Sequence, residues 1–92
     1  MALTITEQNG IYFAAGAINV MTALSFKNHI ETVMLNLEDL VINIENVTEI
    51  DTGGMIALRS IYAYTVKHDI KFFVVGTGCK EVYDDLYLSN VA

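Results

Sequence analysis

Apolar residues follow two different spacings along this chain, and together these predict a sheet covered by helices. Near the N-terminus, Leu3-Thr4-Ile5-Thr6 alternates apolar and polar residues, which is typical of a half-exposed strand. Asn9-Gly10 follows, and this pair is a strong hairpin signal because both residues tolerate a positive φ. Ile11 to Ala15 then forms the second strand, ended by Gly16. We expect these two strands to pair antiparallel.

From Thr22 to Asn36 the apolar residues recur at steps of three and four, the spacing of a helix with one buried face. The expected buried stripe consists of Ala23, Phe26, Ile30, Val33 and Leu37. A third strand is predicted over Leu40–Glu45. The segment Val47-Thr48-Glu49-Ile50 is interpreted as a connection that leads to Asp51.

A second helix is predicted from Thr52 to Lys67, with a buried side made of Met55, Leu58, Tyr62 and Val66. Lys71 to Gly76 contains an unbroken apolar run that is typical of a fully buried strand. Gly76-Thr77-Gly78 turns the chain into a short helix with Val82 and Leu86 on one face. The order is ββαβαβα, an α/β fold with a mixed four-stranded sheet in one domain, residues 1–92. The third and fourth strands should be parallel, because a helix crosses between them.

Composition narrows the class of protein. Hydrophobic residues make up 53% of the chain, which suffices for a packed core without disulfides or metal. Five Lys and Arg face eleven Asp and Glu, so a direct nucleic-acid partner is not expected, because phosphate binding needs basic side chains. Cys79 is the single cysteine, which fits a reducing compartment. With neither a signal peptide nor an apolar run of about 18–20 residues, we expect a cytoplasmic protein without membrane insertion.

Asp51-Thr52-Gly53-Gly54 stands where the second helix begins. Capping alone explains an Asp or Thr at most helix starts, because a side-chain oxygen there accepts an unpaired backbone N–H. Capping does not explain the two glycines, since each costs a helix roughly 1 kcal/mol relative to alanine. We therefore expect Gly53 and Gly54 to leave backbone N–H groups open to a partner or an anion. The Thr52 hydroxyl is accessible for modification, and a phosphate there would sit at the positive end of the helix dipole.

Stepping by three or four residues from Thr52 predicts a docking edge beside the buried face of the second helix. Its members are Ile56, Arg59, Ser60 and Ala63. An exposed Ile is also common on ordinary protein surfaces, so a face without function stays open as the alternative.

The segment from Val41 to Met55 resembles the signature of the STAS domain family. Val41-Ile42-Asn43-Ile44, then Val47 and Ile50-Asp51-Thr52-Gly53-Gly54-Met55, looks like the family's strand, short loop and Asp-Ser-Ser-Gly-Leu. Gly16-Ala17-Ile18-Asn19 is similar to the family's Gly-x-Leu-Asp. Val74-Val75-Gly76 is similar to its strand after the second helix. The order of elements agrees over essentially the whole chain.

The resemblance implies a protein-binding switch of the anti-sigma-factor-antagonist type and not an enzyme. In that branch an anti-sigma factor serine/threonine kinase phosphorylates the hydroxyl residue after the motif Asp, and only the unphosphorylated form binds the kinase. By position, Thr52 is the phosphoacceptor and Asp51 is the acid that precedes it. We expect the partner to contact this helix start and the docking edge beside it, which together comprise Asp51, Thr52, Gly53, Gly54, Ile56, Arg59, Ser60 and Ala63. This chain departs from the family in having Gly53 for the second Ser and Thr for the commoner Ser at the acceptor position.

A second interpretation of the same resemblance remains open. The chain could instead be a constitutive STAS subunit, as in a lipid-transport ABC complex or a stress-signalling scaffold, with Thr52 as a contact residue that is never phosphorylated. A weak homodimer is also left open.

The remaining polar residues predict neither a catalytic site nor a metal or cofactor site. His29 and His68 have no His or Cys at ligand spacing, and surface positions are the simpler explanation. Cys79 is expected to be a buried or half-buried thiol. Gly76-Thr77-Gly78 lacks the Lys and the spacing of a phosphate-binding loop. Asp84-Asp85 with Glu81 is expected to be a solvated face, and the tyrosines Tyr62, Tyr64, Tyr83 and Tyr87 to be packing residues.

Overall fold

A computed structural model describes residues 3–91, with side chains described up to Leu86. The elements are β1 (Thr4–Gln8), β2 (Ile11–Ile18), α1 (Ala23–Val33), the 3-10 turn η1 (Met34–Asn36), β3 (Asp39–Ile50), α2 (Thr52–Lys67), β4 (Lys71–Val75) and α3 (Cys79–Val91). This is the expected ββαβαβα order. The bounds of α2 agree with the prediction at both ends.

The four strands form one mixed sheet in the order β1-β2-β3-β4. β1 and β2 pair antiparallel and β3 and β4 pair parallel, as expected, and β3 is also parallel to β2. The hairpin between β1 and β2 turns at Asn9 and Gly10, whose φ angles are 53° and 83°. The Gly10 N–H donates to a carboxylate oxygen of Glu7 at 2.8 Å, which closes the turn.

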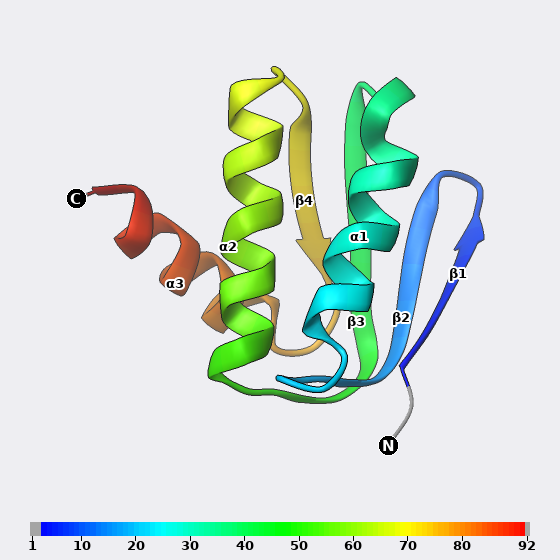
Figure 1. Ribbon diagram of the computed structural model, residues 1–92, viewed down its shortest axis with the longest axis vertical. Helices are drawn as coiled ribbons and strands as arrows, with labels where there is room; N and C mark the ends of the chain where they lie inside the picture. The colour runs from blue at the N-terminus through cyan, green and yellow to red at the C-terminus, as the bar shows by residue number, and fades with distance from the viewer. Residues whose placement is uncertain (1–2, 92) are drawn as a thin grey trace.

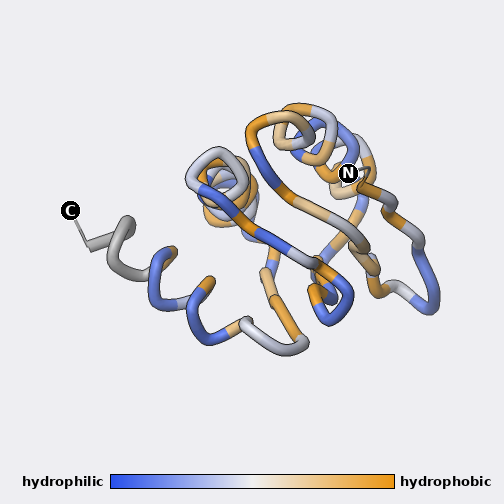
Figure 2. Tube along the Cα trace, turned by 90° about the horizontal axis from the view of Figure 1, so that it is seen from below, coloured by the Kyte–Doolittle hydropathy of each residue, from blue (hydrophilic) through white to orange (hydrophobic). Residues whose placement is uncertain are grey.

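Helices α1 and α2 lie side by side on one face of the sheet (Figure 1). Seen along the strands in Figure 2, both helices lie on the same side of the sheet, and α3 lies beside it. The core between helices and sheet is formed by Tyr12, Ala14, Ile18, Phe26, Ile30, Met34, Leu40, Ile42, Ile44, Ala57, Leu58, Ile61, Val74, Val82 and Leu86. Val82 and Leu86 come from one face of α3, as predicted.

Strands β2 and β3 are longer than the sequence pattern indicates. β2 continues through Gly16 to Ile18, and β3 continues to Ile50, so the predicted connection Val47–Ile50 is strand. The two extensions pair with each other, Gly16 with Val47 and Ile18 with Ile50. The register is irregular before Ala15 and again after Gly16. Gly16 has a φ of 111°, which a glycine adopts without strain. The alternation of apolar residues breaks at such irregularities, which is why periodicity missed the extension.

Strand β4 is not fully buried, which corrects the expectation from its apolar run. Val74 is 1% exposed, but Phe73 and Val75 are 43% and 38% exposed. β4 is an edge strand, and helices cover only one face of the sheet, so alternate side chains point to solvent.

The buried face of α2 is rotated relative to the predicted one. Leu58 is fully buried, as expected, but Val66 is 57% exposed. Met55 and Tyr62 are only half-buried. The buried positions are Gly54, Ala57, Leu58, Ile61 and Thr65. The rotation arises because α2 packs against α1 as well as the sheet, which buries small residues that a hydrophobicity pattern does not single out.

Candidate functional site

Asp51 caps α2 and also holds the loop between β2 and α1. One carboxylate oxygen accepts the Gly54 N–H at 2.9 Å, and the other accepts the Val20 N–H at 3.3 Å. The Asp51 backbone N–H donates to the Ile18 carbonyl at 3.3 Å. The N-cap interpretation is therefore confirmed. Because both carboxylate oxygens bind backbone donors, Asp51 ties two chain segments together at one point.

The two glycines serve close packing, and at Gly54 this corrects the expectation of an open N–H group. A Cβ on Gly54 would lie 2.0 Å from the Ile18 carbonyl oxygen, and one on Gly53 would lie 2.9 Å from the Val20 Cα. Gly54 is buried, and its N–H is already bound by Asp51. The glycines allow the start of α2 to lie directly against the β2–α1 loop, so they shape the site from inside.

Thr52 is the first residue of α2, and its side chain is exposed. Its hydroxyl forms no hydrogen bond with another described residue. The N-terminal ends of α1 and α2 lie next to each other at the bottom of Figure 1, and Gly53, the residue after Thr52, lies against Val20 of the β2–α1 loop. Thr52 is therefore an exposed residue at the helix start that lies against the β2–α1 loop.

An apolar groove runs between α1 and α2 beside Thr52, with a volume of about 280 Å³. We call it the α1–α2 groove; it is lined by Val20, Ala23, Leu24, Lys27, Gly53, Ile56, Ala57 and Ser60. Three of its large apolar side chains are strongly exposed: Val20 at 73%, Leu24 at 69% and Ile56 at 53%. Met21, next to Val20, is 87% exposed. Exposed large apolar side chains gathered in one patch are typical of a protein-binding surface.

The predicted docking edge lies only partly on this groove. Ile56 and Ser60 line it, and Ala63 is exposed farther along α2. Arg59 does not line it. The α1 side of the groove, above all Val20 and Leu24, was missed by the sequence reasoning. A signal was available, because Leu24 is a large apolar residue that falls outside the predicted buried stripe of its helix.

Arg59 instead holds α3 against α2. Its Nε and Nη2 donate to the two carboxylate oxygens of Asp85 at 2.7 and 3.0 Å, a bidentate pair. The hydrogen bonds from Arg59, aided by its charge, lower the pKa of Asp85. Asp85 is thus engaged and not simply solvated, which corrects that expectation. Asp84 is exposed as expected and pairs with Lys80 at 3.1 Å.

The turn Gly76-Thr77-Gly78 binds the protein's own carboxylate. The Thr77 N–H and hydroxyl both donate to Glu45 at 2.9 Å, and these hydrogen bonds lower the pKa of the Glu45 carboxyl. Gly76 has a φ of 105°, and a Cβ there would lie 2.7 Å from the Glu45 backbone nitrogen. The turn therefore anchors the start of α3 to β3.

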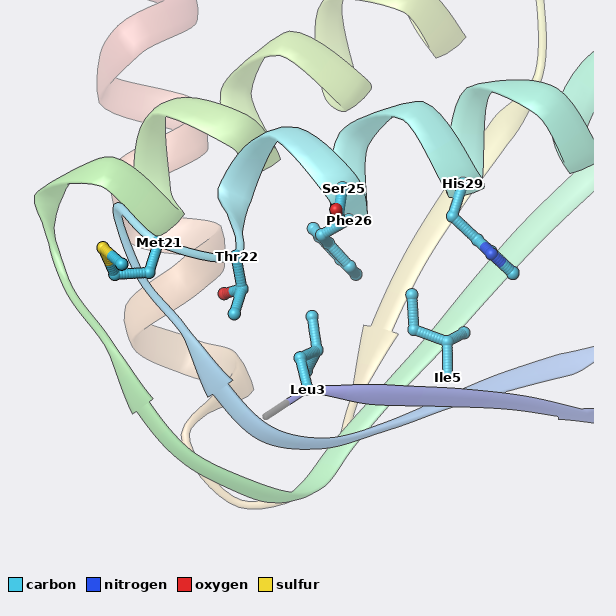
Figure 3. A pocket seen from close by; sticks show the side chains of 7 residues that line it. All are labelled: Leu3, Ile5, Met21, Thr22, Ser25, Phe26 and His29. Carbon is cyan, nitrogen blue, oxygen red and sulfur yellow. The ribbon is translucent and has the colours of Figure 1, made fainter. Parts of the chain in front are cut away.

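A second hollow of about 400 Å³ lies between β1 and α1, lined by Leu3, Ile5, Met21, Thr22, Ser25, Phe26 and His29 (Figure 3). The Thr22 hydroxyl is engaged, because it donates to the Ala17 carbonyl at 2.7 Å. His29 is exposed, and His68 stacks on Tyr64 with ring centroids 4.2 Å apart. Cys79 is half-buried, as expected. Among the described residues, no three His, Cys, Asp or Glu side chains come together as a metal site.

The fold and the helix start at Asp51 together define a STAS domain. The chain belongs to the STAS domain family, which matches residues 1–91. Among solved structures, the chain is similar to one described as a crystal structure analysis of Mglu, with a TM-score of 0.66 and 14% identity over 82% of this chain. At that identity the likeness shows the fold alone. This chain spans 19% of the Mglu chain.

Among curated proteins, no sequence matches this chain. Within residues 3–91, no helix is long and apolar enough to cross a membrane.

Proposed function

We infer that this STAS domain is a phosphorylation-regulated protein-binding switch that resembles the anti-sigma factor antagonists. Its partner is an anti-sigma factor serine/threonine kinase, which binds when Thr52 is unphosphorylated and which phosphorylates the Thr52 hydroxyl with ATP. The observation that carries this proposal is that Thr52 is exposed and directly precedes Gly53, which lines the α1–α2 groove.

The α1–α2 groove provides the surface through which the partner kinase binds the unphosphorylated form. Val20, Leu24 and Ile56 are more than half exposed, so a partner that covers them removes apolar surface from water. Lys27 is the cation of the groove, and it already pairs with Glu31 at 3.1 Å. The contact expected here is therefore apolar at its centre, with the Thr52 hydroxyl at its rim.

A phosphate on Thr52 would oppose that contact. It adds roughly −1.5 to −2 charges at neutral pH. Lys27, the basic residue that lines the groove, is paired with Glu31, so it is not free to neutralise the phosphate. The neighbouring Asp51 is itself an acid, and both of its carboxylate oxygens accept backbone N–H groups. The fold tolerates the added charge because it sits at the N-terminus of α2, where the helix dipole favours anions. A partner would have to bury that charge without a counter-ion, which is costly.

The experiment is a titration of wild-type, Thr52→Ala and Thr52→Glu protein against the kinase, with circular dichroism to confirm folding. Thr52→Ala should bind like wild type but accept no phosphate. Thr52→Glu should bind at least about tenfold more weakly, which corresponds to about 1.4 kcal/mol. Thr32→Glu is the matched control, because Thr32 is exposed near the other end of α1 and receives the same charge.

Two results would contradict the proposal. The first is equal binding by Thr52→Glu and wild type, and the second is phosphate incorporation that persists in Thr52→Ala. Equal binding would favour the constitutive-subunit interpretation, in which Thr52 is a contact residue only.

A further inference from the structure

The sheet has a second face, which the described helices leave uncovered. Side chains alternate along β4, so Val74 points to the helices while Phe73 and Val75 point away and are exposed. The register places Ile11 of β2, Val41 of β3 and Phe73 of β4 in one row across this face. The next row contains Phe13, Asn43 and Val75. Apolar side chains thus cross three strands on the side opposite the α1–α2 groove.

Charge is absent from these two rows, although the chain carries a net charge of −6. The row beyond them pairs Asp39 of β3 with Lys71 of β4, one acid and one base at the same height along neighbouring strands. Both are exposed, and neither forms an ion pair with another described residue. The Glu45 carboxylate, toward the other end of β3, already accepts a hydrogen bond from the Thr77 hydroxyl.

We propose that this face pairs with the same face of a second copy of the chain, forming a weak homodimer. A two-fold axis that runs along the strands between β3 and β4 places each β3 opposite the partner's β4. Such a contact is isologous, so every pairing occurs twice. The row positions then fall opposite each other: Asp39 faces the partner's Lys71, and Val41 faces the partner's Phe73. Any other occupant would need its own base and acid at matching positions, whereas a second copy provides both.

The size of the face sets the strength of the dimer. Only β3 and β4 of each copy overlap about this axis, because β4 is the edge of the sheet. Strands about 4.8 Å apart and a rise of about 3.3 Å per residue make two strands of five residues roughly 10 by 17 Å, about 160 Å² in projection. A standard stable interface buries about 800 Å² on each partner. The dimer therefore forms only at high protein concentration and exchanges rapidly.

Charge reversal provides the test, with sedimentation equilibrium from about 10 μM to about 1 mM as the measurement, a range chosen for a weak dimer. In the dimer, Lys71→Glu places an acid opposite the partner's Asp39, and Asp39→Lys places a base opposite the partner's Lys71; each contact occurs twice. Each single variant should weaken self-association by about tenfold. The double variant D39K/K71E should restore it, because the exchanged charges face each other again. A mixture of the two single variants should associate more strongly than either alone.

Phe73→Thr removes the most exposed large apolar side chain of these rows while placing a β-branched residue with high strand propensity there, and it should also weaken the dimer. Leu24→Thr, on the opposite side of the sheet, is the matched control and should leave self-association unchanged. The proposal is overturned if the wild type stays monomeric up to the highest concentration. It is also overturned if the double charge variant fails to restore association while circular dichroism shows it folded, or if Leu24→Thr weakens the dimer instead of Phe73→Thr. None of these outcomes depends on kinase binding, so the two proposals fail separately.

Discussion

Asp51 belongs to the family motif, and its side chain also holds the fold together at the start of α2. Its carboxylate accepts one N–H from α2 and one from the β2–α1 loop, so it joins the two segments that border the α1–α2 groove. A role in capping explains an Asp at this position without any part in phosphorylation. The regulatory chemistry proposed here therefore depends on Thr52, and Asp51 contributes by holding the groove in shape.

Gly54 offers a test at the scale of a single residue. Helix propensity alone predicts that Gly54→Ala would stabilise the protein by roughly 1 kcal/mol. The structure predicts the opposite, because the new Cβ would lie 2.0 Å from the Ile18 carbonyl oxygen, a backbone atom that cannot turn aside. We expect a loss of about 1–3 kcal/mol or more, as for other overpacked sites.

The measurement for Gly54→Ala is urea unfolding followed by far-UV circular dichroism, since the chain contains no Trp. Gly53→Ala is the companion variant, because its Cβ would meet Val20 at 2.9 Å and needs a smaller shift. A Gly54→Ala protein more stable than wild type would show that the start of α2 does not lie against the β2–α1 loop.

At the scale of elements, the rotation of α2 about its own axis decides which of its residues lie in the core, in the α1–α2 groove and against α3. It carries the Leu58 face into the core, the Ile56 face to the groove and the Arg59 face to α3. Because the residues that mark these faces are only one to three positions apart in sequence, a small error in rotation exchanges core positions for surface positions. Val66 was assigned to the core in this way, although it is exposed.

Two truncations separate the predicted and observed rotations of α2. Leu58→Ala should cost about 2–5 kcal/mol, because it removes a fully buried side chain and leaves a cavity. Val66→Ala should cost less than about 0.5 kcal/mol, as most exposed substitutions do. Unfolding free energies from urea titrations provide the comparison, with Ile56→Ala as a second exposed control. Equal losses at Leu58 and Val66 would contradict the observed packing of α2.

At the scale of the whole molecule, two carboxylates attach the C-terminal part to the rest. Glu45 holds the turn before α3, and Asp85 holds α3 itself to α2. The pKa of each is lowered in the folded chain, from 4.5 for Glu45 and from 3.8 for Asp85. A carboxyl with a lowered pKa binds fewer protons in the folded than in the unfolded state, so its contribution is complete above the unfolded value. It is lost as the pH falls from there through the folded value.

Acid titration should therefore loosen this part of the molecule below about pH 4.5, the ordinary value for Glu45. This loss of stability opposes a second effect of acid. Neutralising the net charge of −6 relieves electrostatic self-repulsion within the folded chain. A double variant, Glu45→Gln with Asp85→Asn, isolates the two carboxylates, and its stability should fall less steeply with acid than that of wild type. Urea unfolding between about pH 3 and pH 7 measures both slopes. Identical slopes would mean that neither carboxylate contributes.

Local signals in the sequence determined much of this protein. The Asn9-Gly10 hairpin, the helix from Thr52 to Lys67 and the order of the elements depend on φ preferences, capping and periodicity, all of which act within a few residues. The place of Thr52 at an exposed helix start follows from the same local rules.

Only the tertiary structure decided which side of each element is covered. The apolar run in β4 and the stripe on α2 indicate burial, but neither indicates how many layers lie above them, so Phe73 and Val66 were assigned to a core that does not reach them. The packing of Gly54 against Ile18 and the α1–α2 groove join residues more than 30 positions apart. Burial of a side chain depends on what the rest of the chain places against it, and that information is not local.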